Sequence, residues 1–303
     1  MIDYQSITLD KKQAYEQVLS QAGERGCEYS FANLYLWGRQ RMAFLHGNVT
    51  VFSQYDRKSV YLFPIGNGDL KATLESIIDD ANARDIPCRL TGLFREDCDR
   101  LEQMFPGKFR VHTDRNSFDY IYAVEDLAEL TGRRFQKKRN HLNRFRQCNP
   151  NAVTEPITAE NREEVLEMVR LWYELRLQED PTLDFHMERA AFCKAMQYQQ
   201  ELGMEGLLLR VDGKIAAMTL GSRLSQNTFD VHFEKALEKY DGAYPAINQA
   251  FARYIRQKYP EVTLLNREDD MGIEGLRKAK MSYNPSRFRE KYWACLLEDG
   301  YDY

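Results

Sequence analysis

Several features that would identify a secreted, metal-binding or membrane-spanning protein are missing from this sequence. The six cysteines form no CxxC pair and show no metal-ligand spacing with the five histidines, so we expect reduced thiols. No apolar run approaches the roughly 18 residues that a membrane span requires. The N-terminus lacks the basic segment and apolar run of a signal peptide. These absences predict a cytoplasmic protein, with peripheral membrane contact through a partner left open.

The composition is that of a folded protein. Hydrophobic residues make up 43% of the 303 residues and aromatic residues 12%, which excludes a disordered chain. A chain of this length is expected to form about two domains. The formal net charge of −4 is modest and does not by itself indicate a partner.

The expected helices and strands follow one order twice. In the first half a hairpin around His46–Asn48 is followed by a strand, a helix, a strand, a helix and further strands. In the second half a hairpin at Asp212–Gly213 is followed by a strand over 228–236, a helix over 244–259 and a strand over 262–266. A helix over 273–281 and one strand over 287–297 are expected to finish the chain.

Two copies of one layout predict a tandem repeat of a mixed α/β fold with a mixed sheet in each copy. The expected limits are an N-terminal domain over 1–126, a linker helix over 127–150 and a C-terminal domain over 151–303 that carries the site.

The expected linker carries positive charge only. Residues 131–149 contain seven Lys or Arg and no acidic residue, although the chain as a whole is acidic. Such segregation favours an anionic partner, and Lys137, Lys138 and Arg139 are the candidate contacts. The alternative is a solvated linker helix anchored by apolar residues, namely Phe135, Leu142 and Phe145.

A glycine stands where the helix over 244–259 begins, just after a strand that ends in Glu234, Lys235 and Ala236. A glycine there lets backbone amides approach a phosphate, and the helix dipole favours negative charge. The segment is therefore a candidate pyrophosphate cradle, with Lys235, Gly242, Ala243, Tyr244 and Asn248 as its expected contacts. An ordinary loop before a helix explains the same glycine.

Polar residues also gather between the strand that ends at Asn266 and the helix over 273–281. Strand ends and helix starts are common ligand sites in α/β sheets, and Asn266 is a candidate contact. Catalytic candidates are Lys280 for donor phosphate or leaving group, Tyr283 as proton donor or orienter, and Glu234 or Asp270 as base. Glu268 and Asp269 are further candidates for the base, and we expect no metal because consecutive carboxylates diverge.

These segments carry a family resemblance over essentially the whole chain. The tandem layout, the basic helix around Lys137–Asn140 and the closing Gly275–Pro285 stretch resemble the GNAT acyltransferase superfamily. They are more similar to a bacterial family related to the C-terminal domain of phosphatidylglycerol lysyltransferase, and distantly to the Fem peptidyl transferases, which use aminoacyl-tRNA. The closing segment keeps the lysine and the aromatic residue of the Fem pattern but lacks its glycine.

The resemblance implies direct transfer of an acyl or aminoacyl group from a phosphate-bearing donor to an amine or hydroxyl acceptor. Coenzyme A or an acyl-CoA is one implied donor, and aminoacyl-tRNA is the other. The GNAT pyrophosphate pattern is degenerate around Gly242, which keeps only the middle glycine and a basic residue. A non-catalytic GNAT-fold protein that binds a CoA-like ligand or RNA is therefore the second hypothesis.

Overall fold

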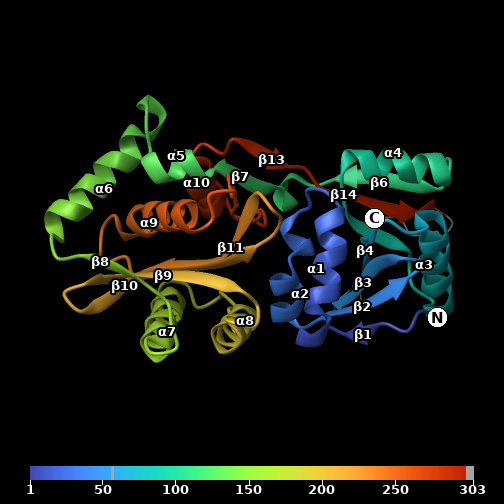
Figure 1. The fold of residues 1–303 in the computed structure, drawn as a ribbon, viewed down its shortest axis with the longest axis horizontal. Coiled ribbons are helices and arrows are strands. Elements are labelled where there is room, and N and C mark those ends of the chain that lie inside the picture. Colours follow the sequence, from blue (N-terminus) through green and yellow to red (C-terminus); the bar gives the residue numbers. More distant parts are fainter. Residues whose placement is uncertain (56–57, 298–303) are drawn as a thin grey trace. The chain divides into compact units, whose positions relative to one another are not determined.

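The computed structural model describes residues 1–55 and 58–297, and its chain divides into two compact units. Unit 1 comprises Met1–Asp119 and the residues from Arg289 onward, and unit 2 comprises Tyr120–Phe288. Each unit is built around a seven-stranded sheet with parallel and antiparallel strand pairs. Figure 1 shows both sheets with their helices.

Neighbouring strands in the sheet of unit 1 are antiparallel except for one parallel pair, β4 with β5. Its sheet order is β1 (Gln5–Ser6), β2 (Gln40–Leu45), β3 (Asn48–Tyr55), β4 (Lys58–Gly66), β5 (Arg89–Leu93), β14 (Tyr292–Leu296) and β6 (Phe109–Thr113). Its helices include α1 (Lys12–Gln21), α2 (Phe31–Trp37), α3 (Leu70–Arg84) and α4 (Arg95–Met104). The expected N-cap of α3 is confirmed, because the Asp69 carboxylate accepts from the amide of Ala72 at 2.9 Å.

Unit 2 repeats this pattern, and its parallel pair is β11 with β12. Its sheet order is β13 (Arg287–Arg289), β7 (Asp119–Ala123), β12 (Leu264–Asn266), β11 (Thr228–Ala236), β10 (Lys214–Arg223), β9 (Met204–Val211) and β8 (Val153–Pro156). Its helices include α5 (Val124–Glu129), α6 (Gln136–Cys148), α7 (Arg162–Glu179), α8 (His186–Gln197), α9 (Ala243–Lys258) and α10 (Glu274–Met281).

The repeat expected from the sequence is therefore present, but the strand expected over 287–297 is not one strand. It is broken after Arg289, and its two pieces, β13 and β14, lie in different sheets. β14 pairs with β5 and β6 in the first sheet, while β7 from the middle of the chain pairs with β12 in the second. Each sheet thus takes a strand that is distant in sequence, and the units divide differently from the expected limits of 1–126 and 151–303.

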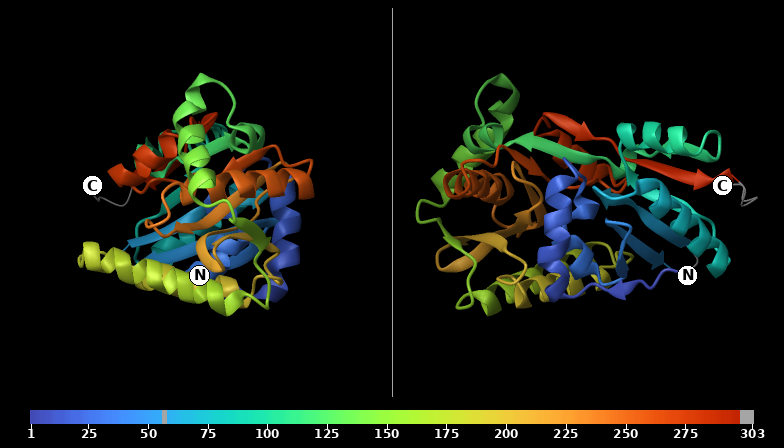
Figure 2. Two further views of the ribbon diagram at one scale, coloured as in Figure 1. Left: turned by 90° about the vertical axis from the view of Figure 1, so that its left-hand side faces the viewer. Right: turned by 45° about the vertical axis from the view of Figure 1, so that its right-hand side comes forward.

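Helices cover both faces of the second sheet. Phe229 on β11 packs on Phe251 of α9, with ring centroids 5.9 Å apart. Phe233 on the same strand packs on Phe192 of α8, at 5.2 Å. Figure 2 shows α7 on the opposite side of this sheet from α9.

A β-bulge changes the side-chain alternation of β11. In its pairing with β10, Leu220 lies opposite Phe233 but Gly221 lies opposite Val231, so His232 is the extra residue. A bulge of this kind re-aims the side chains that follow it. Glu234 consequently lies on the α9 face together with Phe229 and Val231, although strict alternation would place it on the other.

The six cysteines, all within the described residues, form no disulfide in the structure. Among the residues that the structure describes, no helix has the length and apolar character needed to cross a membrane.

The glycine before α9 is required by packing. Gly242 has φ +86°, and a Cβ at this position would lie 2.7 Å from the His141 carbonyl oxygen and 2.9 Å from Phe145 Cβ, both on α6. We predict that Gly242→Ala lowers the free energy of unfolding by about 2–4 kcal/mol, because left-handed strain adds to overpacking.

Gly213→Ala is the matched control for this prediction. Gly213 has a similar φ of +78°, but no atom lies within 4 Å of the added Cβ. Denaturant unfolding should give the Gly213 variant the smaller loss, about 1–2 kcal/mol, from strain alone. Equal losses in the two variants would contradict the proposed contact with α6.

Candidate active site

Charged side chains meet on the α9 face of the second sheet, at the place where β11 and β12 separate. The two strands pair only from Thr228–Asp230 to Leu264–Asn266, and β11 continues beyond the end of β12. The Glu234 carboxylate accepts from Arg267 Nη2 at 2.8 Å and from Asn248 Nδ2 at 3.2 Å. We call Glu234, Arg267, Asn248, Lys138 and Tyr283 the Glu234 cluster.

Polar atoms in and beside this cluster are buried without a recorded hydrogen-bond partner. Among the described residues, Arg267 Nη1 and Asn248 Oδ1 have none. The same is true of Thr219 Oγ1 on β10, directly opposite Glu234 in the strand register. Buried polar groups are normally paired, since leaving one unsatisfied costs about 1–3 kcal/mol. Three such atoms around one carboxylate make the Glu234 cluster the candidate site for polar atoms of a ligand.

Lys138 and Tyr283 connect the basic helix α6 to the segment after α10. The Lys138 ammonium lies 3.8 Å from the centroid of the buried Tyr283 ring, and the Arg267 guanidinium lies 4.9 Å from the same ring. Burial, assisted by the charge of Arg267, lowers the pKa of Lys138 to about 8. Burial also raises the pKa of Tyr283, so its hydroxyl stays protonated at neutral pH. The cluster holds two cations and one carboxylate, which favours an anionic ligand.

Lys280 fixes the loop after β12. Its ammonium donates to the backbone carbonyls of Arg267 and Asp269, and its own carbonyl accepts from the Tyr122 hydroxyl at 2.7 Å. Lys280 is only 8% exposed. The residue therefore positions Arg267 through the backbone, and its expected contact with donor phosphate stays a prediction.

Asp270 is held in a network of donors. It accepts from Arg277 Nε at 2.8 Å, from Arg277 Nη2 at 2.9 Å and from the Tyr120 hydroxyl at 2.5 Å. The hydrogen bonds from Arg277 hold the pKa of Asp270 well below its usual range. A carboxylate stabilised in this way is a poor proton acceptor, and its position fits an anchor for α10.

The other expected contacts lie in several places. Asn266 is fully buried and caps its own loop by accepting from the Glu268 amide at 2.7 Å. Lys235 lies on the α8 face, where it donates to Glu188 at 2.5 Å and its ammonium lies 4.0 Å from the Trp172 ring. Ala243 is buried, and Tyr244 is 37% exposed. Because packing explains the glycine at 242, its presence no longer argues for a pyrophosphate.

The basic segment packs against α9 through buried Phe135, Leu142 and Phe145, in agreement with the anchored-helix alternative. Several of its cations have partners. Arg139 donates to the backbone carbonyls of Leu130 and Gly132. Three other arginines pair with acidic or amide side chains, namely Arg134 with Asp126, Arg144 with Asp241 and Arg146 with Gln249. Arg133 and Lys137 are exposed, and no partner is recorded for them among the described residues. These two cations are available to an anionic partner.

Sequence reasoning missed Arg267, the cation of the cluster that pairs with Glu234. It stands between the candidates Asn266 and Glu268, and neither spacing nor charge distinguished it from its neighbours. Its partner Glu234 was a candidate, but the bulge that directs Glu234 toward Arg267 has no sequence signal of its own.

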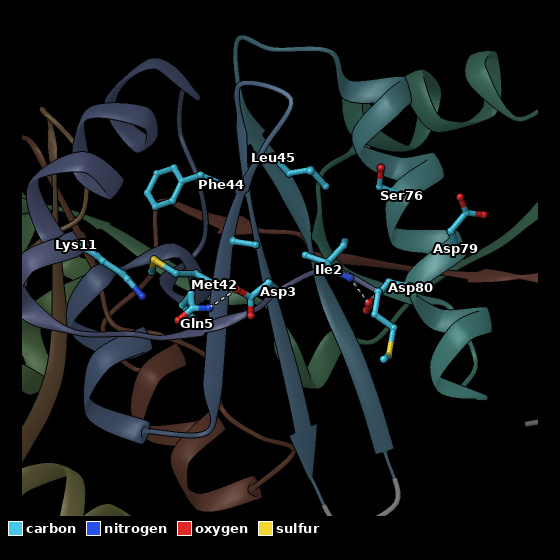
Figure 3. Close-up of a pocket in the computed structure, with 12 residues that line it drawn as sticks. Ile2, Asp3, Gln5, Lys11, Met42, Phe44, Leu45, Ser76, Asp79 and Asp80 are labelled. Carbon is cyan, nitrogen blue, oxygen red and sulfur yellow. Dashed lines mark hydrogen bonds between the residues drawn. The ribbon is translucent and has the colours of Figure 1, made fainter.

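Two described hollows are not lined by residues of this cluster. Unit 1 has a hollow of about 620 Å³, and Figure 3 shows Lys11, Phe44 and Asp79 among its lining residues. Unit 2 has a cleft of about 510 Å³ lined mainly from α6, α9, β8 and β9. None of the residues expected at the site from the sequence lines either hollow.

Two groups of side chains have the residue types that metals prefer. Cys27, Glu28 and Asp119 converge in unit 1, where the Lys291 ammonium lies 2.5 Å from Asp119 and 2.7 Å from Glu28 and supplies the positive charge. Asp230, His232 and Glu268 converge in unit 2. There the imidazole joins a hydrogen-bonded chain with Ser222 and Glu268.

The two mixed sheets, each with a parallel strand pair beside a hairpin, give the chain a tandem GNAT-like fold. Residues 20–295 match the family model described as phosphatidylglycerol lysyltransferase, C-terminal, and the chain belongs to this family.

Solved structures share this fold. A conserved protein of unknown function from Bacteroides thetaiotaomicron is 38% identical, with a TM-score of 0.92 over 98% of this chain and all of that one. L-PGS from Bacillus licheniformis shares the fold at 17% identity, with a TM-score of 0.68 over 100% of this chain and 95% of that one. FemX is 13% identical, with a TM-score of 0.63 over 96% of each chain.

A curated relative matches part of the chain. An uncharacterised protein of Mycoplasmoides gallisepticum is 27% identical over 180 residues, which cover 58% of this chain and 56% of that protein.

We predict that the Lys138 ammonium titrates near pH 8, below its usual 10.5, because the fold disfavours its charged form. The folded state then releases this proton before the unfolded state does. The free energy of unfolding should therefore rise as pH increases from about 8 toward the unfolded pKa of about 10.4.

Lysine-selective NMR, with Lys138→Met to assign the signal, measures this pKa, and unfolding of both proteins across the same pH range measures the stability. A midpoint near the usual value, or an equal rise in the Lys138→Met protein, would contradict the burial of this amine.

Proposed function

We propose that this protein is an aminoacyltransferase that moves an aminoacyl group from charged tRNA directly to a hydroxyl or amine acceptor. The observation that carries the proposal is the Glu234 cluster in a chain of the lysyltransferase C-terminal family. It contains an ion pair whose Arg267 and Glu234 side chains are 12% and 9% exposed, beside unsatisfied Arg267 Nη1 and Asn248 Oδ1. A lysyltransferase acting on phosphatidylglycerol, as the family's description reads, attaches an amino acid to a lipid hydroxyl.

Each residue of the cluster has a role in this proposal. Arg267 supports the negative charge that develops on the ester carbonyl oxygen, since preorganised donors are most effective where charge develops. Glu234 keeps Arg267 in place, because both carboxylate oxygens already accept hydrogen bonds. Lys138, partly neutral near pH 8, takes the proton of the attacking acceptor and returns it to the ribose oxygen of the leaving tRNA as the ester bond breaks. Tyr283 orients Lys138, and Lys280 holds the loop.

Charged tRNA is favoured over coenzyme A as the donor. The glycine that suggested a pyrophosphate cradle is explained by contact with α6, whereas Arg133 and Lys137 remain exposed on a basic surface suited to a phosphate backbone. A cytoplasmic location is part of the same proposal.

We predict that the purified protein transfers radiolabelled amino acids from charged bacterial tRNA to phosphatidylglycerol vesicles or to an amine-bearing peptide. Arg267→Met should reduce transfer about 100-fold or more, the cost of losing an oxyanion donor. Arg223→Met, which removes a half-exposed arginine elsewhere in unit 2, is the control and should transfer normally. Tight tRNA binding without transfer to either acceptor would favour the non-catalytic binding protein. A rise in melting temperature with coenzyme A would restore that donor.

We further predict that tRNA affinity falls steeply with salt and that the basic segment, residues 131–149, accounts for part of the slope. Replacing Arg133 and Lys137 together by Gln should reduce the slope of log Kobs against log salt by about 1–2, because each phosphate contact contributes about 0.7–0.9. Lys71→Gln, on an exposed face of unit 1, is the control and should leave the slope unchanged. If the Arg133 and Lys137 replacement also leaves the salt slope unchanged, the proposed RNA contact at this basic segment is contradicted.

A further inference from the structure

A second chemically organised group lies on the other face of the sheet in unit 2. Ser222 Oγ on β10 lies 2.8 Å from His232 Nε2 on β11. His232 Nδ1 lies 3.0 Å from Glu268 Oε1, in the loop after β12, and 3.7 Å from Asp230 Oδ2. Residues from two neighbouring strands and from the loop after the next strand thus form one hydrogen-bonded chain.

The protonation of the chain follows from its partners. An ionised Glu268 can only accept, so His232 Nδ1 must donate to it. In a neutral imidazole Nε2 then carries the lone pair, and the Ser222 hydroxyl donates to it. A hydroxyl bound to the free nitrogen of a histidine that a carboxylate orients is the arrangement that activates a serine nucleophile.

The sheet is adapted locally to bring these groups together. The bulge at His232 aims the imidazole at Ser222. Gly221, the residue before Ser222, allows the strands to approach, because a Cβ there would lie 2.2 Å from the Asp230 carbonyl oxygen. Alternation along β10 places Ser222 on the face opposite Thr219, and hence opposite the Glu234 cluster.

Burial strengthens the electrostatics of the chain. The side chains of His232 and Asp230 are 1% and 0% exposed, so Asp230 and Glu268 act on the imidazole with little screening by water. Ser222 lies at the end of its strand, next to the exposed Arg223, and the Glu268 side chain is 25% exposed. Ser222 itself is 3% exposed, so an ester must enter at this rim to reach the hydroxyl.

We propose that Ser222, His232 and Glu268 are a catalytic triad that takes acyl groups from carboxylic esters, a second activity of this protein. Ser222 Oγ attacks the ester carbonyl carbon, and its proton passes to His232 Nε2. The bond to the alcohol oxygen then breaks, His232 returns the proton to the leaving alcohol, and an acyl-serine remains. Water, deprotonated by His232, attacks the acyl-serine, releases the carboxylic acid and restores the Ser222 hydroxyl. The activity does not rest on aminoacyl transfer at the Glu234 cluster.

The test is covalent labelling of the full chain with a fluorophosphonate probe, followed by peptide mass mapping. The expected result is an adduct on Ser222 together with hydrolysis of p-nitrophenyl acetate. Both His232→Gln and Glu268→Gln should slow labelling, the histidine variant by about 100-fold or more, as expected for loss of a general base. Neither charged tRNA nor an acceptor is needed, so failure here is distinguishable from failure of the proposed aminoacyl transfer.

Ser225→Ala is the matched control, because Ser225 lies in the adjoining turn and its hydroxyl bonds Asn227 instead of a histidine. This variant should label like the original protein, whereas Ser222→Ala should not label. Melting temperatures check that the variants fold. The adduct is also mapped on the original protein, so this part of the test does not depend on the folding of any variant. Absence of an adduct at Ser222 in the folded original protein, or equal labelling rates in His232→Gln, would overturn the proposal.

Discussion

The arrangement of polar side chains in unit 2 depends on two hydrogen bonds that the Lys280 ammonium donates to backbone carbonyls. They hold the loop after β12 at Arg267 and Asp269, while Arg277 and Tyr120 hold the same loop at Asp270. A loop fixed at these points can present Arg267 to Glu234 on one face of the sheet and Glu268 to His232 on the other. Successive residues of one short loop thus serve two polar groups on opposite faces.

The separation of β11 from β12 gives that loop its room. Parallel strands that part expose backbone and side chains which a continuous sheet would cover, and such openings are common ligand sites in α/β proteins. The bulge at His232 then determines on which face of the sheet each of the following side chains of β11 lies. Without it Glu234 would point toward α8, and Arg267 would be a buried cation with no carboxylate, an arrangement that costs several kcal/mol.

The sequence predicted what depends on local pattern. Hairpins with their turn residues, the Asp69 cap and the repeated order of elements are local features, and the structure contains them. Candidates such as Lys138, Glu234 and Tyr283 come together in one cluster from α6, β11 and the segment after α10. The position of β14 was not predictable in this way, because its pairing with β5 and β6 joins residues about 200 positions apart, beyond any local period. Arg267 and His232 contact their partners because of the bulge in β11 and the loop after β12, and neither feature produces a recognisable residue spacing in the sequence.

We infer that the polar atoms around Glu234 bind the aminoacyl end of the donor. A crystal structure with a non-hydrolysable 3′-aminoacylamino-adenosine would show this contact. We expect the aminoacyl carbonyl within hydrogen-bond distance of Arg267 Nη1, with a polar atom of the ligand on Asn248 Oδ1 or Thr219 Oγ1. An analogue bound elsewhere, with Arg267 Nη1 and Asn248 Oδ1 still unsatisfied or satisfied by protein groups, would contradict it.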